Sequence, residues 1–276
     1  MLILSQLSGL LSAIIIFLIF VFLIFEMLPL LMRVDLLQFV NSNWSPSNGS
    51  YGLWPMVAGS IWVVVGAVAI AAPLGIAVAI FNVWYAPYII SSILQVVLAL
   101  LAGITSVVFG LWGLQVLVPK INIVQPPGLS VLAGIFILAI MILPTAALLS
   151  DATLRSLPKS YMQGAMALGI GRWAAIRHIL LPAASTNLIG AIVLQVGRAI
   201  GETMAVLMVM GNALQIPTDI FDPARTLTSH MALEMAYASG DHRRALFLTG
   251  FLILLIVTTL VLFSVWLGRR QNYENR

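Results

Sequence analysis

The sequence contains no cysteine, which excludes disulfide bonds and thiolate-held metal sites in this chain. Charged residues are scarce as well: they make up 8% of the 276 residues, against roughly 25% in soluble globular domains. The chain also lacks the Gly-x4-Gly-Lys-Ser/Thr phosphate loop. It is therefore not itself a nucleotide hydrolase, and we expect a non-enzymatic chain with no catalytic residues.

The three histidines are His178, His230 and His242, and their positions lack the spacing of a metal site. We expect them to be ordinary surface residues and expect no bound metal.

What the chain has in quantity is apolar residues, at 61%. This composition predicts an all-α integral membrane protein. The first apolar run is interpreted as a retained transmembrane helix rather than a signal peptide, because no basic residue precedes it and no small-x-small cleavage site follows. Residues 1–54 are then one helix and an external loop, and residues 55–276 hold five more helices. The six predicted spans are residues 10–32, 55–80, 89–118, 129–150, 186–210 and 245–267.

Two polar stretches interrupt the later spans. Residues 120–128 predict a turn containing proline. Residues 211–243 predict a surface helix, with Asp222 as its N-cap, Pro223 at its first position and Gly240 at its end.

Lys and Arg counts predict the orientation. With six spans, both termini and the loop at residues 151–182 share one side of the membrane. That side carries seven basic residues (Arg155, Lys159, Arg172, Arg177, Arg269, Arg270, Arg276), and the other carries five (Arg33, Lys120, Arg225, Arg243, Arg244). The positive-inside rule makes the first side cytoplasmic. The net charge of +4 thus indicates orientation in lipid, and we expect no nucleic-acid partner.

Within the loop at 151–182, small residues are followed by a glycine suited to a helix C-cap, Gly169. The spacing resembles the cytoplasmic EAA loop of ABC importer permeases. Gln163 and Gly164 stand where that family usually has Glu and Ala. An ordinary amphipathic connector is the alternative interpretation. The residues on the fixed positions of the motif are Gly169, Ile179, Leu181 and Pro182. The ATPase-coupling residues that the resemblance implies are Gln163, Gly164, Ala165, Gly169, Ile179, Leu181 and Pro182.

The predicted fifth span contains two opposite charges, Arg198 and Glu202. Either would cost roughly 2.5–3.5 kcal/mol at the centre of a lipid-facing helix, so neither is expected to face lipid. Their spacing of four residues places them on one helix face. Two interpretations remain open: an internal ion pair that locks helices together, or an anion path in which Arg198 meets the substrate and Glu202 holds it in place.

The segment Gly197–Val206, followed by Gly211-Asn212, resembles the corresponding part of the permease subunits of phosphate-specific (Pst) ABC importers. Residues 73–77, 103–113 and 139–145 are similar to those subunits as well, so the resemblance covers most of residues 55–265. Thr105 is a departure, because the family commonly has proline there. We expect it to leave the third helix less kinked.

The resemblance implies the type I ABC importer permease fold, with residues 55–276 as its core and residues 151–182 as the coupling loop to an ATPase. It implies a substrate path or gate at Arg198, Glu202 and Thr203. The implied partners are a second, related permease, two cytoplasmic ATPases that bind ATP and Mg, and an external phosphate-binding protein. No cofactor is expected on this chain, which would lie in the bacterial cytoplasmic (inner) membrane with both termini cytoplasmic.

Three other functions remain open. Another oxyanion, sulfate or molybdate, is an alternative cargo for the same machine. A secondary transporter or a channel is an alternative of another class, although no internal repeat of 20 to 50 residues supports it.

Overall fold

The computed structural model describes residues 2–274, without the side chains of residues 2–5, 36 and 267–274. Arg276 and the side chains of Arg269 and Arg270, which entered the orientation count, lie outside this description. The described chain is helical apart from one short hairpin and an isolated bridge. Six of its helices are long and apolar enough to cross a membrane, which confirms the predicted class: 6–31, 54–85, 106–124, 131–155, 172–200 and 240–266.

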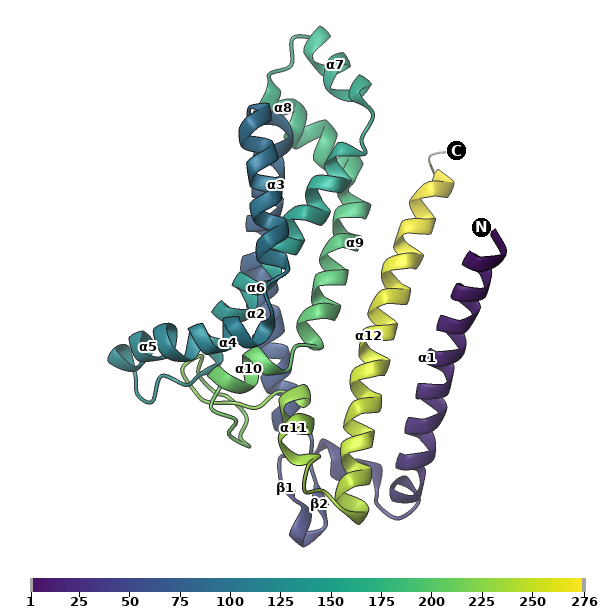
Figure 1. Ribbon diagram of the computed structural model, residues 1–276, viewed down its shortest axis with the longest axis vertical. Helices are drawn as coiled ribbons and strands as arrows, with labels where there is room; N and C mark the ends of the chain where they lie inside the picture. Colours follow the sequence, from purple (N-terminus) through teal and green to yellow (C-terminus); the bar gives the residue numbers. More distant parts are fainter. Residues whose placement is uncertain (1, 275–276) are drawn as a thin grey trace.

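Six helices run along the long axis of the molecule (Figure 1): α1 (Leu2–Leu31), α2 (Trp54–Ile80), α3 (Tyr88–Ala102), α6 (Val131–Arg155), α9 (Leu181–Ile200) and α12 (Gly240–Glu274). Both termini lie toward the same end of the molecule as α7 (Lys159–Ala167). Helix α11 (Leu227–Glu234) lies toward the opposite end with the hairpin of β1 (Trp44–Ser45) and β2 (Ser50–Tyr51). The predicted arrangement, with both termini and the 151–182 loop together, is therefore confirmed.

The remaining elements are short. Single turns of 3₁₀ helix are η1 (Leu36–Val40) and η2 (Pro46–Asn48), and π-helical turns are η3 (Phe81–Tyr85), η4 (Gly113–Leu117) and η5 (Ile176–Leu180). The short α-helices are α4 (Ser106–Trp112), α5 (Val118–Val124), α8 (Arg172–Ala175) and α10 (Met204–Val209).

The third predicted span is not one helix. Helix α3 ends at Ala102, and the chain then turns so that α4, η4 and α5 lie across the long axis (Figure 1). The expectation of a less kinked helix at Thr105 is wrong, because Thr105 adopts an extended backbone (φ −71°, ψ 148°) just before α4. The predicted turn at 120–128 is wrong in its first half, since residues up to Val124 belong to α5.

The fifth predicted span is also broken. Helix α9 ends at Ile200, and α10 begins at Met204. The reason is tertiary packing: a Cβ atom on Gly110 of α4 would lie 3.1 Å from Ala205 Cα of α10, so the two short helices pack backbone to backbone. Hydropathy alone does not report such a contact.

The surface helix starts later than predicted. Its N-cap is Thr226, which forms a capping box with Ser229. Asp222 instead caps a preceding turn, where its carboxylate accepts hydrogen bonds from the backbone N–H groups of Thr218 and Asp219, each at 2.9 Å. The predicted helix end at Gly240 is wrong too, because α11 ends at Glu234 and Gly240 is the first residue of α12.

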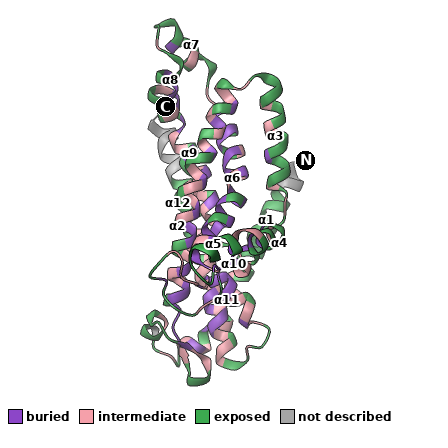
Figure 2. Cartoon of the chain, turned by 90° about the vertical axis from the view of Figure 1, so that its left-hand side faces the viewer, coloured by how far each residue is buried: buried purple, intermediate pink, exposed green. Residues whose placement is uncertain are grey.

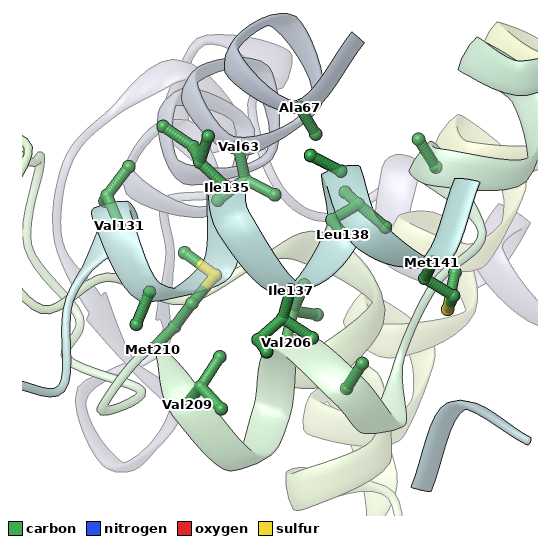
Figure 3. Packing of buried hydrophobic residues seen from close by; sticks show 14 of the residues in the cluster. Val63, Ala67, Val131, Ile135, Ile137, Leu138, Met141, Val206, Val209 and Met210 are labelled. Carbon is green, nitrogen blue, oxygen red and sulfur yellow. The ribbon is translucent and has the colours of Figure 1, made fainter. Parts of the chain in front are cut away.

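Helix α6 is the centre of the core. Figure 2 shows its buried residues along much of its length. Val63 and Ala67 of α2 cover one side of it, and Val206 and Val209 of α10 cover another (Figure 3). Outside this core, α1 packs against α12, and Phe22 meets Phe247 edge to face with ring centroids 5.5 Å apart.

Helices α2 and α6 approach so closely that Gly75 has no room for a side chain. A Cβ atom there would lie 2.9 Å from Ala146 Cβ. We predict that Gly75→Ala lowers the free energy of unfolding by roughly 1–3 kcal/mol, because overpacking forces the helices apart. Thermal unfolding in detergent measures this. Gly9→Ala in α1 is the control, since nothing lies within 4 Å of its Cβ position. Equal melting temperatures for the two variants would contradict the prediction.

Candidate functional site

The break between α9 and α10 is held by hydrogen bonds to the backbone. The Glu202 carboxylate accepts from the backbone N–H of Ala205 at 3.2 Å, so it caps the start of α10. Thr228 of α11 donates its hydroxyl to the Glu202 carbonyl at 2.7 Å. Thr203 donates weakly to the Gly201 carbonyl at 3.4 Å. Glu202 and Thr203 thus shape the break.

Arg198 lies in the last turn of α9 and is exposed. Among the described residues its guanidinium forms no hydrogen bond or ion pair. Glu202 does not pair with it. In a continuous helix the two side chains would share one face, but α9 ends at Ile200 and the Glu202 carboxylate binds the backbone of α10 instead. Of the two interpretations drawn from the sequence, the mutual ion pair is absent, and Arg198 is open to a ligand or another chain.

The face of α9 next to Arg198 is anchored in the core. Gln195 is buried and accepts a hydrogen bond from Thr145 of α6 at 2.7 Å. Ala184, Leu188 and Ala191 bury the same side of the helix. The anchored face fixes the rotation of α9 about its axis and so fixes the outward direction of Arg198.

The first half of the loop at 151–182 is helix α7 with a glycine cap. Gly169 has φ +73°, and the backbone N–H of Ile170 donates to the Ala165 carbonyl at 3.0 Å. This is the bond pattern of a Schellman cap, which confirms the predicted C-cap. Ala165 is buried, whereas Gln163, Gly164 and Gly169 are exposed. A Cβ atom on Gly164 or Gly169 would meet nothing within 4 Å, so this surface is open to another backbone.

The second half of the loop returns to the membrane as one helical run, α8, η5 and α9. Ile179 and Leu181 are half-buried, and Pro182 sits at the start of α9, where a missing N–H costs little. Arg172 of α8 donates to the Trp84 carbonyl at 3.1 Å and lies 5.8 Å from the Tyr85 ring centroid. The loop is therefore fastened to the end of the second span. Exposed on it are Tyr161, Met166, Leu168 and Trp173.

The residues that form this capped helix-turn-helix lie within the region of the chain that matches a known family. The family model described as "Binding-protein-dependent transport system inner membrane component" matches residues 71–273. The chain belongs to this family. It is a multi-pass membrane permease, and its relatives are subunits of ABC transporters rather than enzymes.

Several proteins similar in sequence to this chain are named as transport permeases. The permease is 42% identical over 246 residues to the "Probable ABC transporter permease protein YqgH" of Bacillus subtilis, covering 87% of this chain and 80% of the relative. It is 33% identical to the "Phosphate transport system permease protein PstC" of Mesorhizobium japonicum (80% of this chain, 74% of the relative). To the protein of that name from Haemophilus influenzae the identity is 32% (79% and 76%).

The fold of the permease is also found in a solved structure. A bacterial alginate ABC transporter, crystallised with an alginate-bound periplasmic protein, matches with a TM-score of 0.65 at 17% identity. The match covers 96% of this chain and 94% of that one. At this identity the likeness shows the fold, which is that of ABC importer permeases.

The permease holds a buried carboxylate, Asp151, near the α7 end, which sequence analysis missed. Asp151 accepts hydrogen bonds from Asn82 of η3 at 2.6 Å, Gln95 of α3 at 3.2 Å and Arg155 of α6 at 2.7 Å. The cluster ties the ends of the second, third and fourth spans together. A signal was present in the spacing of four between Asp151 and Arg155 at the end of an apolar run.

A second buried carboxylate, Glu234, lies at the opposite end of the permease. Its carboxylate accepts hydrogen bonds from Trp44 of the hairpin, from Arg225, and from His242 of α12, each at 2.8 Å. His230 packs edge to face on Trp44, with ring centroids 4.3 Å apart. His230 is fully buried, so its prediction as a surface residue is wrong. The sequence analysis contained no sign of this cluster, whose members lie up to 198 positions apart. No group of three or more metal-binding side chains was found in the described residues.

The pKa of His230 is lowered from 6.5 to about 4, mainly by burial; Glu234 raises this pKa, whereas Arg225 and His242 lower it. The folded permease therefore keeps this ring neutral at pH values where the unfolded chain binds a proton. His230 therefore leaves the free energy of unfolding unchanged above about pH 6.5, and it lowers this free energy as the pH falls from there toward 4.

We predict that lowering the pH from 7 to 5 reduces the free energy of unfolding of the wild-type permease by about 2 kcal/mol through His230 alone. In His230→Gln this part of the pH dependence is absent. Melting temperatures of the purified protein at the two pH values measure it. His178→Gln is the control, since His178 is exposed and its replacement leaves the pH dependence as in the wild type. A wild-type pH shift in the His230 variant would refute the assignment.

Proposed function

We propose that this permease is half of the translocation path of an ATP-driven importer of inorganic phosphate. The observation that carries the proposal is the Arg198 guanidinium, exposed on α9 beside a helix break and without a partner among the described residues. A guanidinium binds oxyanions in a planar, two-pronged contact. The identities of 33% and 32% to phosphate transport permeases support phosphate as the anion.

In this proposal a second, related permease faces the exposed side of α9. An external phosphate-binding protein delivers the anion at the end of α11 and the hairpin, which lies outside the cell. The α7 end, with both termini, lies in the cytoplasm of a bacterium, as the Lys and Arg count favours. Two ATPases bind there and hold ATP and Mg, and this chain binds no cofactor.

Coupling runs through the loop at 151–182. We assign α7 to a groove on one ATPase, where the open faces of Gly164 and Gly169 allow close approach. Gln163 keeps a polar contact there without the charge of the usual Glu. A cavity of about 430 Å³, lined in part by Trp84, Arg155 and Gln163, lies between α7, η3 and the end of α6. Movement of α7 reaches the spans through the Arg172–Trp84 contact and the Asp151 cluster.

We predict that Arg198→Ala lowers phosphate uptake by the reconstituted complex by about tenfold to a hundredfold, the effect of losing a charged hydrogen bond of 1.5–3 kcal/mol. Arg198→Lys restores uptake only in part, because an ammonium lacks the paired donors. Arg33→Ala, an exposed arginine in the loop after α1, is the control.

Sulfate and molybdate uptake, assayed in parallel, identify the anion. Faster transport of either than of phosphate would transfer the function to that oxyanion. Transport in the absence of the ATPases would indicate a secondary transporter or a channel. Normal phosphate uptake in Arg198→Ala would remove the arginine from the path.

We predict that Gly164→Leu abolishes ATPase binding while the permease remains folded. A Cβ atom here lies more than 4 Å from other atoms of this chain, so we expect the clash to arise with the ATPase. Co-purification with a tagged ATPase and the melting temperature of the permease measure the two effects. Gly9→Leu, equally open in α1, retains the ATPase. A Gly164→Leu permease that still co-purifies with an active ATPase would remove α7 from the interface.

A further inference from the structure

A groove of about 270 Å³ opens between α6, α9 and α12, toward the α7 end from Arg198. Its walls include Leu149 and Thr153 of α6, Asn187, Gly190 and Leu194 of α9, and Ser264 of α12. Neither carboxylate cluster contributes to it, and no charged side chain is among its lining residues in the described part of the chain. Its described lining is therefore a mixture of apolar and uncharged polar side chains.

The groove and Arg198 occupy the same face of α9. At about 100° per residue, Asn187, Leu194 and Arg198 fall within an arc of about 40°, and all three are exposed. Asn187 precedes Arg198 by eleven positions, which is about 16 Å along a helix. A solute that leaves Arg198 along this face toward the α7 end meets Asn187 next.

Thr186 also lines the groove, but three other polar side chains there, those of Thr153, Asn187 and Ser264, differ from the hydroxyls elsewhere in the spans. The hydroxyls of Ser185, Thr249 and Thr259 donate to carbonyls three or four residues earlier in their own helices, at 2.7–3.0 Å. Among the described residues, no such bond is found for the side chains of Thr153, Asn187 or Ser264.

A polar group without a partner is unfavourable in hydrocarbon, where no water is present to satisfy it. Three helices that each place one such group around a single groove therefore indicate water and a polar solute in it. Gly190 keeps the groove open, since a Cβ atom there would already lie 3.4 Å from the Ser264 hydroxyl oxygen.

We propose that this groove is a second binding station for the transported oxyanion, on the cytoplasmic side of Arg198. Asn187 offers two amide hydrogens, and Thr153 and Ser264 one hydroxyl hydrogen each, to the oxygens of a phosphate. Without a cation the station binds weakly. A weak site that follows a strong one favours release, because transport needs an anion that can leave as well as enter. The inference rests on the proposed function above.

The absence of cysteine makes a direct test simple. In the complete reconstituted complex, Asn187→Cys is labelled with a membrane-impermeant methanethiosulfonate, and labelling of the permease chain is followed by mass spectrometry. We expect labelling, and we expect inorganic phosphate but not chloride to slow it at least threefold. Thr259→Cys is the control on α12, and phosphate leaves its labelling unchanged. If Asn187→Cys is not labelled, or if phosphate does not change the rate of its labelling, the proposed second binding station is wrong.

Transport provides the second arm. The double variant Asn187→Leu with Thr153→Val is expected to lower the maximal rate of phosphate uptake at least tenfold, and Asn187→Ser with Thr153 intact to restore much of it. Co-purified ATPase and an unchanged melting temperature show that the complex is assembled. If wild-type uptake depends on phosphate and Arg198 but the double variant transports within twofold of wild type, the station is wrong and the proposed function stands. If the wild type does not transport phosphate, the proposed function itself fails.

Discussion

Two of the spans predicted from the sequence are broken in this permease, and the contact between the segments that follow the breaks, α4 and α10, shapes the rest of the site. Gly110 allows the α4 backbone to reach Ala205, and Gly113 lies against Ile137 of the central helix. A side chain at either glycine would separate the layers. The contact ends α9 at Ile200 and turns the chain, so that Arg198 stands at the helix end without the partner that a continuous helix would have offered.

The two buried carboxylates each have several hydrogen-bond donors. Asp151 and Glu234 are buried at opposite ends of the molecule, and each is surrounded by donors from several elements. Buried carboxylates are tolerated only with such partners. They join the helices at the two ends, and Arg198 stands between them in the last turn of α9. An exposed arginine without a partner among the described residues suits a path that an anion must enter and leave.

Local patterns predicted the parts that depend on local physics. Apolar runs of membrane length predicted the class and the number of passes, because a segment that crosses lipid must satisfy its own backbone hydrogen bonds, as a helix does. Gly169 predicted the cap of α7, since a left-handed turn after a helix favours glycine. The EAA-like spacing predicted the loop. The same reasoning failed where a contact from a distant element decided: at Thr105, at the N-cap of α11, and at His230, which a tryptophan 186 positions away covers.

The sequence by itself determined that this chain crosses a membrane six times and places its basic loop and termini together. These properties follow from composition and from motifs whose residues are neighbours in the chain. Only the tertiary structure decided that the third and fifth helices break, that Glu202 caps a helix instead of pairing with Arg198, and that Thr153, Asn187 and Ser264 surround one groove. Each of these depends on which helices touch and how each is rotated about its axis, and hydropathy, which averages over a helix, carries no information on rotation.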